Sequence, residues 1–255
     1  MNIDIKGPQV YVDIPITENF SFTITQTTVS SFLVMIMLCL AFYFLGRNLT
    51  KRPGKMQVLT EKGVTMLYGL IDETMGAHNH KFAPYIGALF LSSFFGSIIG
   101  TTGFFRSSTA DLSTTATWAI MTIVIVWVSN IRENGFLAWL KGFTEPIVVM
   151  TPMNIVSEIA TPVSLAFRHF GNVAGGGVLT TLIYSALAGL TSLIFGWLPE
   201  AIAAVFPPIF QVGIPAFLSI YFDLFSGFVQ ALVFSLLTMV YVGAVSPPPQ
   251  EKTAE

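Results

Sequence analysis

Residues 28–45 read TVSSFLVMIMLCLAFYFL, and this stretch decides the fold class. Crossing about 30 Å of hydrocarbon takes roughly 20 apolar helical residues, so such a run predicts a membrane-spanning helix. The composition agrees, since 53% of the 255 residues are hydrophobic and only 10% are charged. An ordinary soluble domain carries about 25% charged residues. We therefore expect lipid to surround most of the chain.

Basic residues follow this first span closely, and they orient the chain: Arg47, Lys51, Arg52, Lys55 and Lys62. Because Lys and Arg accumulate in cytoplasmic loops, the N-terminus should lie outside, with residues 1–27 as an external segment. That segment lacks the pattern of a signal peptide. Residues 56–77 mix apolar and acidic side chains, which favours an amphipathic helix at the inner membrane surface.

The remainder predicts a single, all-α polytopic membrane domain. Residues 82–130 contain two apolar runs around a short polar turn and indicate a helical hairpin. Residues 146–245 stay apolar, and hydropathy leaves two readings open: three or four ordinary crossings, or two very long helices joined near 196–200. Each long helix would measure about 60 Å and would have to lie steeply tilted. Residues 246–255 predict a disordered cytoplasmic tail.

One cation, Arg168, lies far from either end of its apolar segment. Placing Arg at the bilayer centre costs from about 2.5–3.5 to 10–17 kcal/mol, so it must face water or a counter-charge. At 100° per residue, a polar stripe shares its helical face: Asn154, Ser157, Thr161, Ser164, Asn172 and Gly175. Such a stripe can simply hold helices together. A guanidinium stays charged, however, so it can also attract a mobile carboxylate and block a direct leak of ions.

Two acids accompany this cation. Asp223 lies at membrane depth on a second polar face with Ser219, Gly227 and Gln230, and it suits either transient proton carriage or a structural hydrogen bond. Glu158 offers an acid near the cytoplasmic end of the Arg168 helix, or a carboxylate that snorkels to the surface. His169 points about 100° away from the Arg168 stripe, which favours a packing or interfacial role over ligation.

Several classes of function find no support. The net charge of −2 suggests no nucleic-acid partner, and Cys39 is the only cysteine, so neither a disulfide nor a cysteine metal cage is expected. No phosphate-binding loop or nucleophile motif is present, and we expect no cofactor, no metal and no catalysis by this chain alone. The alternatives to an ion channel subunit are a secondary transporter with a central Arg and an intramembrane hydrolase. A hydrolase is disfavoured because Ser164 and His169 lie on different faces of one helix.

The stretch SLAFRHFGN at residues 164–172 closely resembles subunit a of the F-type rotary ATP synthase, bacterial type. Supporting segments run along the chain: TADLSTT at 109–115, FTEP at 143–146, FD at 222–223, QALVF at 230–234 and LTMVY at 237–241. The resemblance implies a hairpin of two long tilted helices against a ring of c subunits. It also implies two offset aqueous half-channels that couple H⁺ or Na⁺ flow to rotation and ATP synthesis.

The same resemblance implies roles for individual residues. Arg168 would separate the two paths, with Ser164 on the same translocating face. Asp223, Asn172 and Gln230 would line the outer path, and Glu158 the cytoplasmic one. The implied partners are the c ring, the b subunits of the peripheral stalk, the soluble ATPase head and the lipid of a bacterial plasma membrane. Many relatives carry Glu or His nine residues after the Arg; this chain has Gly177, so its inlet should rest mainly on Asp223 and water.

Overall fold

The computed structural model describes residues 9–17, 20–47, 49–102, 104–195 and 220–248. These residues are helical apart from one N-terminal hairpin and short connections, which confirms the all-α polytopic fold class. Within them, five helical segments are long and apolar enough to cross a membrane: Gln26–Arg47, Ala77–Thr102, Leu112–Asn134, Val148–Ile194 and Ser226–Val245.

The described part of the chain begins with a β-hairpin that the sequence did not suggest. Strands β1 (Val10–Thr17) and β2 (Phe20–Thr25) pair antiparallel, with Val10 opposite Thr25 and Ile14 opposite Phe22. Helix α1 (Gln26–Arg47) follows directly. Its large apolar side chains are mostly exposed, as expected for a helix that faces lipid.

Helix α2 (Lys55–Met75) and the short helix η1 (Ala77–Phe82) lead back toward the bundle. Gly76, with φ of +82°, ends α2 in a conformation that L side chains rarely adopt. Two of the residues that define α2 as amphipathic, Ile71 and Met75, are buried, whereas most of its other side chains are exposed. The helix therefore rests on the bundle at its C-terminal end.

The central hairpin consists of α3 (Ala83–Ile98), the short helices η2 (Ile99–Thr102) and η3 (Ser108–Ala110), and α4 (Leu112–Asn134). Asp111 caps α4, because its Oδ1 accepts a hydrogen bond from the Ser113 main-chain N–H at 3.0 Å. A short helix, α5 (Phe136–Gly142), then turns the chain away from the hairpin.

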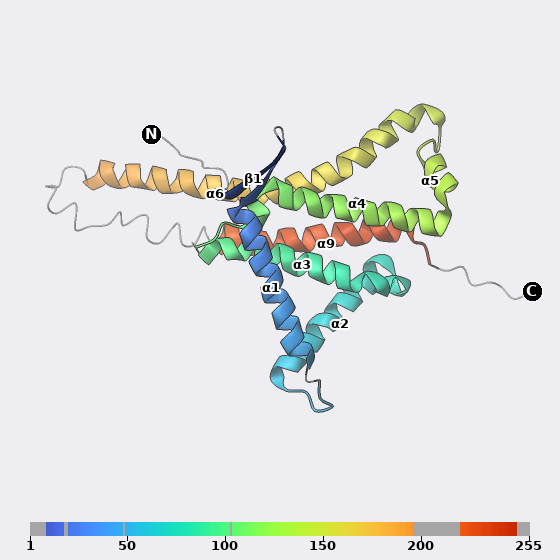
Figure 1. Ribbon diagram of the computed structural model, residues 1–255, viewed down its shortest axis with the longest axis horizontal. Coiled ribbons are helices and arrows are strands. Elements are labelled where there is room, and N and C mark those ends of the chain that lie inside the picture. Colours follow the sequence, from blue (N-terminus) through green and yellow to red (C-terminus); the bar gives the residue numbers. More distant parts are fainter. Residues whose placement is uncertain (1–8, 18–19, 48, 103, 196–219, 249–255) are drawn as a thin grey trace, which may run out of the picture.

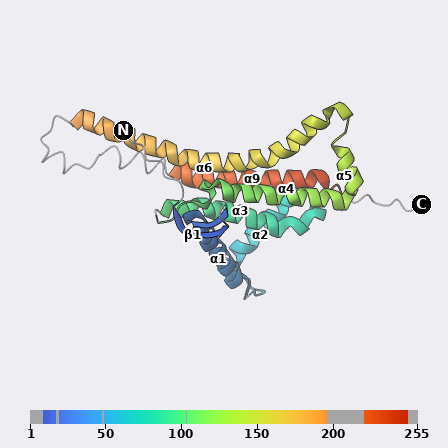
Figure 2. The same ribbon diagram turned by 45° about the horizontal axis from the view of Figure 1, so that its top comes forward.

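After η4 (Val148–Met150), helix α6 (Thr151–Phe195) continues for 45 residues. At 1.5 Å per residue it is about 68 Å long, which selects one very long helix over two ordinary crossings in this part of the chain. Figure 2 shows α6 bowed along its length, and it contains Pro162, which lacks an N–H for the helical ladder. The expected junction near 196–200 lies outside the described residues.

The last described elements are a π-helical turn, η5 (Ile220–Phe225), and α9 (Ser226–Val245). Helices α3, α4 and α9 run side by side, while α1 crosses them steeply (Figure 1). Helix α6 packs along α4 and α9. At Gly227 a Cβ would lie 2.9 Å from the Ser97 Cβ, so glycine permits the close approach of α9 to α3.

Among the described residues, two apolar clusters form the core. The first joins α2, α3, α4 and α9 through Ile71, Met75, Ala83, Ile86, Val126, Met239 and Val242. The second joins α3, α4, α6 and α9 through Leu89, Ala119, Leu165, Ala166 and Phe234. This second cluster fixes the position of α6, and with it the stripe that contains Arg168.

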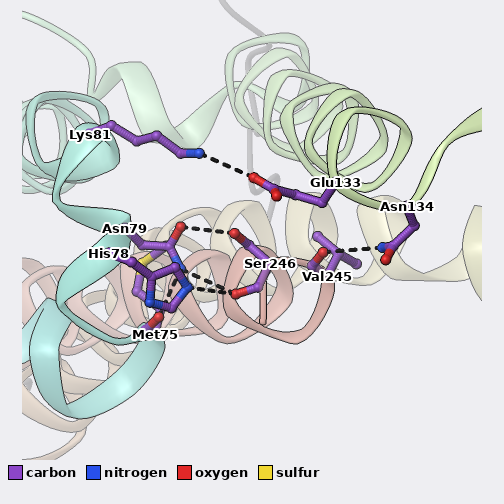
Figure 3. Close-up of polar contacts among 8 residues, drawn as sticks. All are labelled: Met75, His78, Asn79, Lys81, Glu133, Asn134, Val245 and Ser246. Carbon is purple, nitrogen blue, oxygen red and sulfur yellow. Dashed lines mark hydrogen bonds and ion pairs between the residues drawn. The ribbon is translucent and has the colours of Figure 1, made fainter. Parts of the chain in front are cut away.

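Polar contacts hold together one end of the bundle, the Asn79 end, defined by Asn79, Asn134 and Ser246 (Figure 3). The Ser246 Oγ donates to Asn79 Oδ1 at 3.1 Å, and Asn79 Nδ2 donates to the Met75 carbonyl at 2.8 Å. His78 Nε2 lies 2.8 Å from the Ser246 carbonyl. These contacts tie the C-terminal end of α9 to the junction of α2 and η1.

Candidate functional site

Helix α6 has an inward and an outward face around Arg168. Leu165, Ala166 and His169 are buried, whereas Phe167 and Arg168 are exposed. The separation follows from helical geometry, because residues one position apart lie about 100° apart around the axis. The inward face packs on α4 and α9, so the outward face is the one available to other molecules.

The Arg168 side chain lies at membrane depth on this outward face. It is about 26 Å along the helix from Thr151 at 1.5 Å per residue, in a segment apolar enough to span a bilayer. Among the described residues, none forms a hydrogen bond or ion pair with its guanidinium. A permanent cation at this depth requires water or a carboxylate, and the described part of the chain supplies no carboxylate.

The surface beside Arg168 is polar and open. Ser164, Gly171 and Asn172 are exposed, and a Cβ built at Gly171 or Gly175 would meet nothing within 4 Å among the described residues. These glycines are therefore not required by packing against the described helices. Since each Gly in a helix interior costs roughly 1 kcal/mol relative to Ala, their presence on this face needs another explanation.

A cleft of about 430 Å³ opens between α4, α5, α6 and α9. The stripe residues Asn154, Ser157 and Thr161 line it, together with Glu158. It lies toward the Asn79 end, because Ala244 and Val245 of α9 also line it. The predicted polar stripe thus continues from the outward face at Arg168 into this cleft.

Glu158 is half-buried in the cleft, where Trp127 Nε1 donates a hydrogen bond to its Oε1. Trp139 packs against Trp127 with ring centroids 6.2 Å apart and forms part of the same wall. Glu158 is therefore held in place from α4, and the sequence alone did not indicate this indole partner, which lies 31 positions away.

The second polar face points into the bundle. Gln230 is 7% exposed, and Gly227 contacts Ser97 of α3, so both lie on the inward side of α9. The backbone of Asp223 is part of η5, which packs beside α6. Its side chain, like Ser219, lies outside what the structure describes. Irregular π-turns inside helices are frequent at functional sites.

His169 points into the bundle and is fully buried. Its Nε2 lies 3.1 Å from the Ser93 Oγ of α3, and Trp118 of α4 and Phe234 of α9 meet its ring edge-to-face. Its other nitrogen, Nδ1, has no hydrogen-bond partner among the described residues. Sequence reasoning expected a packing or interfacial role for this side chain, but it missed the three partners, which come from three other helices.

Fold and site together define a multi-pass membrane protein that presents Arg168, a cation without a counter-charge among the described residues, on the outward face of a very long helix. The sequence profile described as ATP synthase A chain matches residues 28–243. The chain therefore belongs to the family of ATP synthase a subunits. It is a non-catalytic, ion-translocating component of the F-type ATP synthase complex.

Individual relatives of this chain support the same family assignment. The chain is 31% identical over 267 residues to the sodium-ion-specific ATP synthase subunit a of Propionigenium modestum, covering 93% of this chain and 84% of that one. It is 32% identical to ATP synthase subunit a 1 of Crocosphaera subtropica, with 90% of each chain covered. It is also 31% identical to the Aquifex aeolicus ATP synthase subunit a, over 84% of this chain and 94% of that one.

Proposed function

We propose that Arg168 is the fixed charge that separates two half-channels and draws a ring carboxylate to the outward face of α6. The observation that carries this proposal is the guanidinium exposed at membrane depth without a described partner. Burial of Arg in a bilayer without compensation costs several kcal/mol at least. A carboxylate from a neighbouring subunit removes this cost, and the permanent charge on Arg prevents ions from passing straight along the stripe.

The c ring docks on the outward face of α6. Small residues at membrane interfaces let helices approach closely, and Gly171 and Gly175 are open on this face. Large apolar side chains such as Phe167 and Val163 are also exposed there, which suits a helical partner in lipid. An external helix at this position accounts for both the glycines and the exposed cation.

The cleft that contains Glu158 is the cytoplasmic half-channel. It combines a carboxylate with the polar side chains of Asn154, Ser157 and Thr161, and it lies at the end of the bundle closest to the C-terminal end of α9. The basic residues after α1 support a cytoplasmic position for this end, with the N-terminal hairpin outside a bacterial plasma membrane. An ion released near Arg168 can then follow the polar stripe into the cleft.

The outer half-channel runs on the opposite side of Arg168 along Asn172, Gln230 and Asp223. Support comes from the buried position of Gln230 and from the contact of η5, which contains the Asp223 backbone, with α6. The exposed apolar surface of α1 is available for the b subunits of the peripheral stalk. The soluble ATPase head completes the complex.

The decisive experiment compares Arg168→Ala with Arg168→Lys in the complete complex. Alanine should abolish ATP synthesis driven by an ion gradient while leaving the amount of assembled complex close to that of the wild type. Lysine keeps a charge but loses the planar fork that binds a carboxylate through two parallel hydrogen bonds, so coupling should remain severely reduced. Normal gradient-driven synthesis with alanine at this position would refute the proposal.

The translocated ion is H⁺ or Na⁺, because the ion-binding carboxylate belongs to the ring. Initial rates of ATP hydrolysis by the purified complex over a series of Na⁺ concentrations distinguish the two. Stimulation by Na⁺, together with Na⁺ uptake into vesicles, would assign Na⁺. A rate independent of Na⁺, together with acidification of the vesicles, would assign H⁺.

A further inference from the structure

His169 is attached to three other helices at the residue that immediately follows Arg168. Ser93 belongs to α3, Trp118 to α4 and Phe234 to α9, and each contacts the imidazole from a different element. Leu165 and Ala166, one turn earlier on the same face, add only apolar packing to the second core cluster. His169 is therefore the polar anchor of α6 in this part of the bundle.

A single hydrogen bond can fix the rotation of a helix that apolar packing alone leaves adjustable. Apolar contacts are not directional, and helices of similar apolar surface can rotate against one another with small changes in burial. The hydrogen bond between His169 Nε2 and Ser93 Oγ, at 3.1 Å, forms at only one rotation of α6. Because Arg168 lies about 100° from His169, that rotation also sets where the guanidinium points.

We propose that His169 is a positioning residue for Arg168: its hydrogen bond to Ser93, between two aromatic rings, fixes α6 in the rotation that presents the guanidinium to the ring. This inference rests on the role proposed above for Arg168. His169 itself touches neither the ion nor the ring carboxylate, because it is fully buried inside this chain.

The test compares two substitutions of His169 whose amide side chains differ in length by one methylene group. In His169→Gln the amide reaches the place of Nε2 and retains a partner for Ser93. In His169→Asn it reaches only the place of Nδ1 and loses that partner. Ser93→Ala removes the same hydrogen bond from the other side and changes little volume. All variants are made in the intact complex with Cys39 replaced by Ser, so that one introduced cysteine can be labelled.

Two quantities are measured in each variant. The first is coupling, given as ions pumped per ATP hydrolysed in vesicles. The second is the rotation of α6, given by the labelling rate of a cysteine at Ala166, which is buried, relative to the rate of the same cysteine in the complex with His169 and Ser93 unchanged. We expect His169→Asn and Ser93→Ala to lower coupling and to raise this ratio about two- to tenfold, the factor for loss of one ordinary hydrogen bond. His169→Gln should restore both.

A purely structural role for His169 gives a different result. In that case His169→Asn would reduce the amount of assembled complex, while coupling per complex and the labelling ratio would match the wild type, and the proposal would be overturned. If His169→Asn fails to assemble, Ser93→Ala alone decides between the two outcomes. Normal coupling in Arg168→Ala would instead refute the role of Arg168 itself, whatever the labelling ratio.

Discussion

Asn79 and Ser246 hydrogen-bond to each other although 167 positions separate them, and Asn79 is fully buried. Loss of a buried amide leaves the Ser246 hydroxyl and the Met75 carbonyl without these partners. We expect Asn79→Ala to lower the free energy of unfolding by about 1–3 kcal/mol. Thermal unfolding of the purified complex in detergent measures this effect. Asn134→Ala is the matched control, because Asn134 is exposed and its bond to the Val245 carbonyl is long, at 3.5 Å. Equal losses of unfolding free energy in both variants would contradict the argument that burial makes the Asn79 hydrogen bonds the more important ones.

From the interactions of Asp111 we expect the folded protein to lose stability in acid. Burial raises the pKa of its carboxyl group, but hydrogen bonds from Ser113 and Thr27 and the charge of Arg106 outweigh burial and hold the pKa below its ordinary value. The resulting stabilisation is fully present above the unfolded pKa of about 3.9, and it is lost as the pH falls through the folded pKa.

Asp111→Asn tests this dependence, because Asn still caps a helix but does not titrate. At neutral pH the variant should unfold at a lower temperature than the wild type, and the difference should disappear as the pH falls below about 4. Thr27→Val should show a smaller effect of the same sign, since it removes one hydrogen bond, of 2.5 Å. A difference that stays constant from neutral to acidic pH would show that the charge contributes nothing.

Because Glu158 lies in the proposed cytoplasmic path, we expect its replacement to decrease ion flux through the cleft. Glu158→Gln should reduce passive ion flux through membrane sectors stripped of the ATPase head. Trp127→Phe should reduce it less, because it removes only the indole donor that holds the carboxylate. Glu145→Gln is the control: this second acid lines the same cleft, but its side chain is 65% exposed and lies 3.9 Å from Lys141. Equal reductions for Glu145 and Glu158 would refute a specific path.

The open face beside Arg168 predicts a dependence on side-chain size. Gly171→Ala should be tolerated, because it improves helix propensity and adds a single carbon. Gly171→Leu should leave this chain folded but reduce assembly with the ring, since nothing within the described residues opposes a larger side chain there. Copurification of the ring with each variant measures the effect. Retention of the ring by the leucine variant at wild-type levels would argue against docking on this face.

Local hydropathy was sufficient to predict the first span but not the long helix α6. The first span, expected at residues 28–45, is α1 (Gln26–Arg47), because a continuous apolar run specifies a membrane helix by itself. Residues 146–245 were ambiguous, since the sequence stays apolar for about 100 residues and shows no clear helix boundaries. The family resemblance, rather than hydropathy, indicated the long helix that the structure contains.

The residues of the candidate site were likewise predictable from the sequence only in part. Arg168 is conspicuous in the sequence because a charge in apolar surroundings is costly. The partners of His169 are not, because Ser93 lies 76 positions away and its hydroxyl resembles any other in an apolar segment. The β-hairpin was missed because a proline within a run disfavours a strand, and Pro15 lies within the first one. Helix α5 was missed because seven residues are too few for a clear periodic pattern.

The glycines on the outward face of α6 also bear on how this subunit can be studied and how it can evolve. Alanine at Gly171 or Gly175 would suit the isolated helix better, and no described neighbour forbids it. A stability screen of the subunit alone would therefore report these positions as free to vary and would even reward their replacement. Selection against side chains larger than alanine can operate only in the assembled complex, where the proposed docking of a ring on this face requires a smooth surface.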